Sequence, residues 1–187
     1  ADINAWMMKL NTIVTEMLIA QEIPAVGLPP HSFISQKNGI LETISLDLIK
    51  KYLDLEIIPV LFGDMVLDET IQASVLSGDA IVPYLGSKLL PDKVIYVSDV
   101  DGVYTENPKI NPKAELIPIV NNQNYESIIA KFEQHNELDV TGEMKYKLEE
   151  IKATLPGVQV RMLSGSKPKN LLAAVDSQEV GTTLQFD

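Results

Sequence analysis

Acidic side chains stand at the ends of apolar segments in this sequence, where side chains that handle bound ligands are expected. The apolar run 94–97 leads into Asp99 and Asp101, and Gly102 follows them. Ligands of open α/β sheets bind beyond the carboxyl ends of strands, so Asp99 is placed to orient a catalytic lysine or a nucleotide. Asp101 beside Gly102 is also an ordinary turn signal, and its carboxylate could serve only its own turn.

Lys147 is the basic residue whose position best suits phosphate chemistry. It belongs to a predicted helix that opens near Gly142, with Thr141 as the expected N-cap. It follows Met144 by three residues, on the flank of an apolar stripe, which suits a lysine at the lip of a cleft. Its charge there could stabilise phosphate oxygens during transfer. The competing interpretation is a solvated helix lysine like Lys145.

A second candidate site combines a strand end with a helix start. The strand predicted at residues 57–62 ends at Gly63, and Ser77, Gly78 and Asp79 open the next helix. Ser77 is the expected N-cap, and Gly78 would let an anionic substrate approach the helix N–H groups. The alternative is a capped helix that binds nothing.

The remaining polar candidates are weaker. Tyr104 begins a stretch with two Asn-Pro pairs, which predicts a surface loop that could cover a nucleotide base. His31 and His135 are far apart in the sequence, so they predict neither a catalytic base nor a metal site.

Composition restricts the partners of the protein. The 187 residues carry a formal charge of -11, which argues against a nucleic-acid partner. A few lysines and helix N–H groups still suffice for a small phosphorylated molecule. The chain contains no cysteine, which fits a reducing cytoplasm. No apolar run approaches the roughly 18 residues of a membrane span.

Helices and buried strands must alternate to position these residues. Apolar spacing predicts a core-facing helix over the first twenty or so residues and another at 45–55, and the polar stretch 65–75 predicts a hairpin. The order predicts an α/β protein, a three-layer αβα sandwich with a mainly parallel open sheet. We expect one sheet to contain four apolar runs, at residues 23–28, 57–62, 94–97 and 158–163.

Taken in order, these motifs resemble the amino-acid-kinase superfamily. The resemblance covers nearly the whole chain and rests on Gly63-Asp64, Ser77-Gly78-Asp79, residues 98–104, Asp139-Val140-Thr141-Gly142 with Lys147, and Gly181-Thr182. Pro24-Ala25-Val26 and the stretch that begins at Asp139 look most like the isopentenyl phosphate kinase branch and its fosfomycin kinase relatives.

The resemblance implies an activity and a set of site residues. It implies a cytoplasmic phosphotransferase, expected to be a homodimer, that passes the γ-phosphoryl group of ATP, with Mg²⁺, to a small monophosphate, most simply isopentenyl phosphate. By this resemblance Gly63, Gly78 and Asp79 contact the substrate. Lys147 is implied as the catalytic residue, and no residue is implied as a metal ligand. The implied ATP-binding residues are Asp99, Asp101, Tyr104, Gly142 and Lys147.

The sequence departs from the family pattern in two places. The second glycine after Asp-Val-Thr-Gly is Glu143 here, which removes freedom at positive φ and brings a carboxylate near the expected phosphates. We therefore expect reduced ATP affinity. The N-terminal strand of the family, with its lysine, glycine-rich loop and histidine, has no counterpart, so we expect residues 1–187 to be the central and C-terminal part of a single domain.

Two other functions stay open. A fosfomycin kinase, or another small-acid kinase of this fold, would keep the nucleotide site and replace a prenyl-sized apolar pocket by a small polar one. A non-catalytic nucleotide-binding regulatory module is favoured by Glu143 and by the N-terminal elements that have no counterpart.

Overall fold

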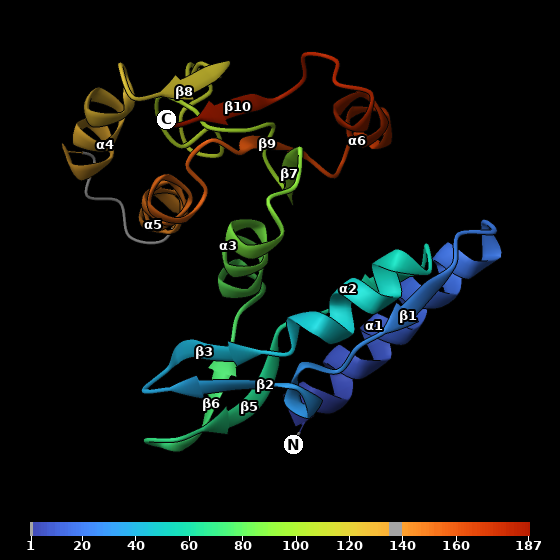
Figure 1. Cartoon of the computed structure of the whole chain (residues 1–187). Helices are drawn as coiled ribbons and strands as arrows, with labels where there is room; N and C mark the ends of the chain where they lie inside the picture. The colour runs from blue at the N-terminus through green and yellow to red at the C-terminus, as the bar shows by residue number, and fades with distance from the viewer. Residues whose placement is uncertain (1, 135–139) are drawn as a thin grey trace. The chain divides into compact units, whose positions relative to one another are not determined.

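The chain folds as two compact units, Ala1–Val82 and Pro83–Asp187. The computed structural model describes residues 2–134 and 140–187. The first unit runs from blue to green in Figure 1, and the second from green to red. Among the described helices, none is long and apolar enough to cross a membrane.

The first unit contains a parallel strand pair and a four-stranded sheet. Strands β1 (Ala25–Gly27) and β4 (Ile58–Val60) form the pair, and helices α1 (Asp2–Ala20) and α2 (Leu46–Asp54) pack on it. The second sheet has the order β3-β2-β5-β6. Its strands are β2 (Ile34–Lys37), β3 (Ile40–Ile44), β5 (Asp64–Asp68) and β6 (Gln72–Leu76), and the short helix η1 (Pro30–Ser32) precedes β2.

The second unit is built on one mixed sheet with the order β7-β9-β10-β8. β7 and β9 are parallel, as are β10 and β8, whereas β10 and β9 are antiparallel. Figure 1 shows α4 and α5 on one side of this sheet and α6 on the other. The elements are α3 (Gly78–Leu89, which begins in the first unit), β7 (Lys93–Ser98), β8 (Ile119–Asn121), α4 (Tyr125–Gln134), α5 (Val140–Thr154), β9 (Gln159–Ser164), α6 (Pro168–Val175) and β10 (Thr182–Gln185).

The α/β class and the predicted hairpin are confirmed. β5 and β6 pair antiparallel from Asp64 opposite Leu76 to Asp68 opposite Gln72. Within the first unit the runs at 23–28 and 57–62 form β1 and β4, which pair parallel, and within the second unit the other two runs form β7 and β9, which also pair parallel. An apolar run indicates that a strand is buried, but backbone hydrogen bonds between distant segments decide which strands pair.

Helix α1 forms where its periodicity predicts, but its apolar stripe does not face the core. Five of its large apolar side chains are 45–68% exposed: Ile3, Trp6, Leu10, Ile13 and Met17. The buried side chain is Asn11, whose Nδ2 donates to the Val60 carbonyl at 2.8 Å. Gly27 permits this approach, since a Cβ there would lie 2.2 Å from Asn11 Oδ1. A hydrogen bond to a strand thus fixes the inward face of the helix.

Asp68 connects the two turns of the four-stranded sheet. Its carboxylate accepts hydrogen bonds from the backbone N–H groups of Asn38, Gly39, Thr70 and Ile71, and from the Ser74 hydroxyl. Burial alone would raise the pKa of Asp68, but the hydrogen bonds from Gly39, Ile71, Thr70 and Ser74 outweigh it and hold that pKa well below its usual range. Asp68 is therefore charged in the folded protein at neutral pH.

Candidate active site

The carboxyl ends of β7 and β9 form one edge of the sheet in the second unit. Their parallel register places Ser98 beside Ser164, and the Gly165 N–H donates to the Ser98 carbonyl at 2.8 Å. The segments that follow, residues 99–103 and 165–167, therefore lie together. A ligand bound beyond this edge would meet both segments.

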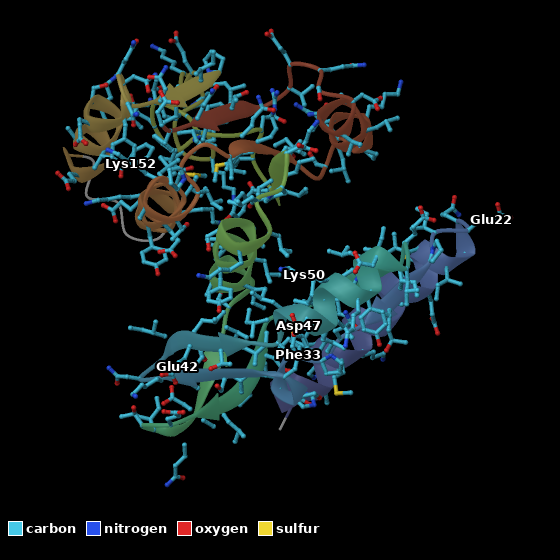
Figure 2. All side chains as sticks on the ribbon, viewed as in Figure 1. Glu22, Phe33, Glu42, Asp47, Lys50 and Lys152 are labelled. Atoms are coloured by element: carbon cyan, nitrogen blue, oxygen red, sulfur yellow. The ribbon has the colours of Figure 1, made fainter. Side chains whose placement is uncertain are left out.

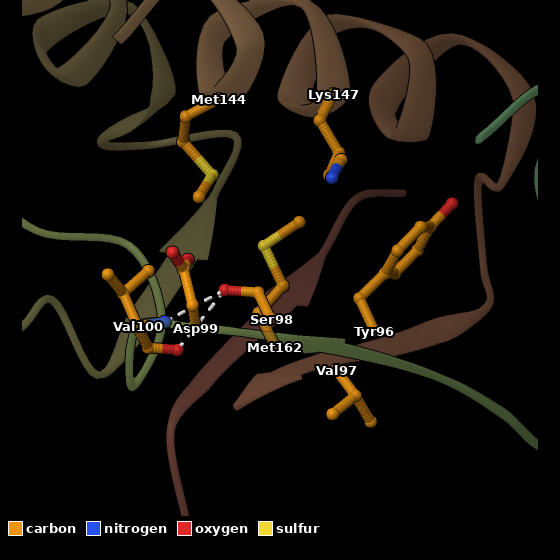
Figure 3. A pocket seen from close by; sticks show the side chains of 9 residues that line it. Tyr96, Val97, Ser98, Asp99, Val100, Met144, Lys147 and Met162 are labelled. Carbon is orange, nitrogen blue, oxygen red and sulfur yellow. Dashed lines mark hydrogen bonds between the residues drawn. The ribbon is translucent and has the colours of Figure 1, made fainter. Parts of the chain in front are cut away.

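Close backbone packing holds the turn after β7. Ser98 Oγ accepts from the Val100 N–H at 3.1 Å, as Figure 3 shows. Gly102 has φ +151°, and a Cβ there would lie 2.4 Å from Thr182 Oγ1. Gly181 has φ +66°, and its Cβ would lie 2.0 Å from the Met162 carbonyl oxygen. Only glycine fits at these two positions, so Gly181-Thr182 supports the Asp99–Gly102 turn from behind.

Thr182 makes the contact that ties this turn to the next loop. Its buried hydroxyl donates to the Ile117 carbonyl at 2.7 Å and accepts from the Val103 N–H at 2.8 Å. We expect Thr182→Val to lower the free energy of unfolding by about 1–3 kcal/mol for each backbone group left unpaired. Chemical denaturation measures this loss. Thr183→Val is the matched control. The Thr183 side chain points to the other face of β10, so its replacement should lower the free energy of unfolding much less. Equal losses in both variants would contradict the role of Thr182.

Lys147 and Asp99 line the same pocket. The pocket is a cavity of about 80 Å³ bounded by β7, β9 and α5, and Met144, Lys147, Tyr96 and Met162 contribute side chains to it. Figure 3 shows the Lys147 amine directed from α5 toward the tip of β7. Its Nζ lies 5.9 Å from the centre of the Tyr96 ring, and its stripe neighbour Leu148 is buried. A cleft-edge position for Lys147, rather than a fully solvated one, is confirmed.

Two lysines that the sequence did not single out pair with the two carboxylates. Lys109 forms an ion pair with Asp99, and Lys167 Nζ lies 2.6 Å from Asp101 Oδ2. The hydrogen bond and charge of Lys109 lower the pKa of Asp99, with a smaller contribution from Lys147. The idea that Asp101 serves only its own turn is wrong, because its carboxylate reaches a lysine 66 residues away. Their positions were the signal in the sequence that could have identified these two lysines, because each of them follows a turn next to the ends of β7 and β9.

The carboxylates and their lysines surround a second cavity beside the first. It measures about 220 Å³, and its lining includes Asp99, Asp101, Tyr104, Lys109, Ser166 and Lys167. Burial raises the pKa of the Tyr104 phenol, and the nearby Asp101 charge raises it further. Tyr104 therefore stays neutral at physiological pH. This region offers positive charge and hydroxyl groups at the strand ends.

Gly142 and Glu143 lie in the first turn of α5. That helix already begins at Val140, so Thr141 is not its N-cap; the Asp139 position lies outside the described residues. Because residue 143 has helical backbone, the loss of positive-φ freedom through Glu143 has no conformational consequence. Five residues separate Gly142 from Lys147, or nearly one and a half turns of helix.

The candidate residues of the first unit also meet. A Cβ on Gly63 would lie 3.2 Å from the Leu76 carbonyl oxygen and 3.6 Å from the Gly78 nitrogen, so Gly63, which immediately precedes β5, packs on the start of α3. Ser77 Oγ accepts from the Asp79 N–H at 3.1 Å, which confirms Ser77 as the cap. A Cβ on Gly78 would meet no atom within 4 Å. The backbone at Gly78 is therefore open to a ligand.

His31 is held by the carboxylate that follows Gly63. Its Nδ1 lies 2.7 Å from Asp64 Oδ2, and Asn4 Nδ2 donates to Asp64 Oδ1 at 2.7 Å. Burial would raise the pKa of Asp64, but hydrogen bonds from His31, Asn4 and the Met65 N–H outweigh it and lower that pKa. Sequence analysis did not predict this contact. His135 lies outside the described residues.

The described residues contain no group of three or more His, Cys, Asp or Glu side chains that could hold a metal ion by themselves. Oxygen donors are nevertheless present at the strand ends. Asp101 Oδ1 is buried without a hydrogen-bond partner among the described residues, and Asp99 lies nearby in the same cavity. Such a pair suits Mg²⁺ that arrives with a nucleotide, because Mg²⁺ keeps several waters and uses few protein carboxylates.

Comparison with known proteins identifies the family of this chain. The model of the amino acid kinase family matches residues 1–160. The chain is 36% identical over 182 residues to an isopentenyl phosphate kinase of Methanothermobacter thermautotrophicus, covering 95% of this chain and 67% of that protein. It is 32% identical over 185 residues to the isopentenyl phosphate kinase of Methanocaldococcus jannaschii, covering 99% of this chain and 67% of that protein.

A solved structure extends the likeness to three dimensions. An isopentenyl phosphate kinase determined by X-ray methods superimposes with a TM-score of 0.78 at 32% identity, covering 95% of this chain and 66% of that one. The chain thus spans about two thirds of the length of the relatives that it matches. With a family model over most of the chain and likeness to two kinases over 95% and 99% of its length, this protein belongs to the amino acid kinase family.

Proposed function

We propose that this protein transfers the γ-phosphoryl group of ATP to isopentenyl phosphate and so forms isopentenyl diphosphate. The observation that carries the proposal is the cavity that Lys147 and Asp99 both line at the carboxyl ends of β7 and β9, in a chain 36% identical to an isopentenyl phosphate kinase. We also propose that the two compact units are parts of one kinase domain and that the enzyme acts in the cytoplasm as a homodimer.

The nucleotide is proposed to lie at the strand ends of the second unit. Lys147 would approach the phosphate that is transferred, and its charge would stabilise the oxygens that gain charge in the transition state. Lys109 and Lys167, now paired with carboxylates, supply further positive charge beside it. Tyr104 and the loop 105–118 would border the nucleotide. The N–H groups of the first turn of α5, at Gly142, would favour its phosphates.

Magnesium is proposed to accompany the ATP. When bound, it neutralises phosphate charge and fixes the geometry of the phosphates. Asp99 and Asp101 are the residues of this site that could hold it or its waters. The hydrogen bond and charge of Lys109 lower the pKa of Asp99 and keep that carboxylate charged until then.

The acceptor phosphate is proposed to bind where Gly63 meets the start of α3. The open backbone at Gly78 and the N–H groups of the 12-residue helix α3 favour an anion there. Asp79 follows directly and is placed to orient groups around that anion. The partly exposed apolar side chains that follow Asp79, Ala80 and Val82, offer a wall for a short hydrocarbon tail.

The acceptor is tested by competition between two substrates. The intact protein is assayed with ATP and Mg²⁺ against isopentenyl phosphate and against fosfomycin, and kcat/KM is compared because discrimination lies in transition-state binding. We expect isopentenyl phosphate to be preferred by about 100-fold or more, since fosfomycin needs only a small polar cavity. A preference for fosfomycin, or ATP binding without transfer to either acceptor, would contradict the proposal.

A further inference from the structure

Asn38 is the asparagine of this sequence that a glycine follows, and Asn38-Gly39 forms the turn between β2 and β3. Both residues have left-handed backbone, with φ +52° at Asn38 and φ +75° at Gly39, as the favoured hairpin turns require. Both are exposed, and a Cβ on Gly39 would meet no atom within 4 Å. The Asn38 amide is therefore open to water, and no side chain at residue 39 obstructs the next peptide nitrogen.

A pair of this kind loses ammonia without an enzyme. Hydroxide removes the proton of the Gly39 main-chain nitrogen, and this nitrogen then attacks Cγ of Asn38. The carbon–nitrogen bond of the side-chain amide breaks, and its nitrogen takes up a proton and leaves as ammonia. Water opens the resulting cyclic imide at either carbonyl group. One opening gives aspartate, and the other gives isoaspartate, in which the main chain is longer by a methylene group.

Asp68 holds the nitrogen that would attack. Its Oδ2 accepts from the Gly39 N–H at 2.7 Å, and its Oδ1 accepts from the Asn38 N–H at 3.0 Å. Gln36 Nε2 donates to the Gly39 carbonyl at 2.9 Å, and the Ser74 hydroxyl lies 2.8 Å from both Gln36 Oε1 and Asp68 Oδ2. The attack requires rotation about the Cα–C bond of Asn38, which would break both contacts of Gly39.

We propose that Asn38 is a deamidation site and that Asp68 controls its rate by holding the Gly39 N–H. A carboxylate could also act as a base toward that N–H. The pKa of Asp68 lies well below its usual range, so this carboxylate is a poor base and keeps the proton in place. Once formed, isoaspartate lengthens the turn and adds a negative charge to it, so the contacts with Asp68 do not form again.

The reaction is measured in the intact protein at neutral pH, below the melting temperature. Mass spectrometry follows the peptide 38–50, which cleavage after lysine releases without residue 68, and chromatography separates aspartate from isoaspartate. We expect conversion of Asn38 to be slower by about tenfold or more in the native protein than in urea. Asp68→Asn should raise the native rate by about tenfold or more, because the N–H loses a charged acceptor. Ser74→Ala should raise it less, since the carboxylate remains.

Two control variants separate this contact from surface charge and from overall stability. Glu42→Gln removes an exposed carboxylate of β3 (Figure 2), which lies 3.8 Å from Lys37 Nζ. Val66→Ala removes buried methyl groups from β5, where Val66 is 1% exposed, and lowers stability while it leaves Asp68 in place. Neither change should alter the rate at Asn38.

Four results would overturn the proposal. An equal acceleration in Val66→Ala and Asp68→Asn would mean that unfolding controls the reaction. A slower reaction in Asp68→Asn would identify the carboxylate as a base. Native protein that reacts as fast as the protein in urea would show that the turn is not protected. Where Asp68→Asn does not fold, an unchanged rate in Ser74→Ala would have the same meaning.

Discussion

Replacing Lys147 with alanine in the intact protein is expected to lower kcat by about 100-fold or more, because a charge that acts on the transferring phosphoryl group is removed. kcat/KM should fall in parallel, as for an interaction made only in the transition state. Lys147→Met is the sharper variant, since it keeps an apolar stem against Tyr96 and removes only the charge. Steady-state kinetics with ATP and isopentenyl phosphate give both constants.

Lys145→Ala is the matched control for this experiment. Lys145 lies on the same helix and forms a surface ion pair with Glu133 at 2.6 Å, outside the cavity that contains Lys147. Surface pairs of this kind contribute little, so most of the turnover should remain. Unchanged turnover in Lys147→Ala, or an equal loss in both variants, would return Lys147 to the role of an ordinary helix lysine.

Replacing Asp68 with asparagine is expected to lower the melting temperature by about 5–10 °C at pH 7, because backbone N–H groups of two turns lose a charged acceptor. The pKa of Asp68 is held below its ordinary value of 3.8 in the folded protein. The carboxylate therefore contributes its full stabilisation above about pH 4, and this contribution is lost progressively as the pH falls from there toward the lowered pKa. The difference between the two proteins should shrink in that acidic range.

Thermal melts from pH 7 to pH 3 measure this difference, and hydrogen exchange locates it. Amide exchange at Gly39 and Thr70 should accelerate in Asp68→Asn, since both N–H groups donate to this carboxylate. Asp54→Asn, at the exposed end of α2, is the control and should change neither quantity. A melting difference that stays constant down to pH 3 would show that the charge of Asp68 does not cause the effect.

The sequence alone predicted the helices, the hairpin and the importance of the strand ends, because local periodicity and turn residues determine these features. Spacing made Asp99 and Lys147 candidates, the family resemblance implied them as site residues, and both line the pocket. Helix α1 was also recognised from its apolar spacing. The sequence did not reveal which way the apolar stripe of α1 faces, because periodicity defines a stripe and does not say what covers it.

Only the tertiary structure decided the contacts between segments distant in the chain. From the sequence, Asp68 is only one polar residue of a predicted hairpin. Its charge matters because its carboxylate accepts a hydrogen bond from the N–H group of Gly39, which lies 29 residues away in the sequence. Lys167 lies beside Asp101 because β7 and β9 pair in parallel. Backbone hydrogen bonds choose strand partners and register, and they are the same for every residue type, so the side-chain pattern of one segment does not encode its partner.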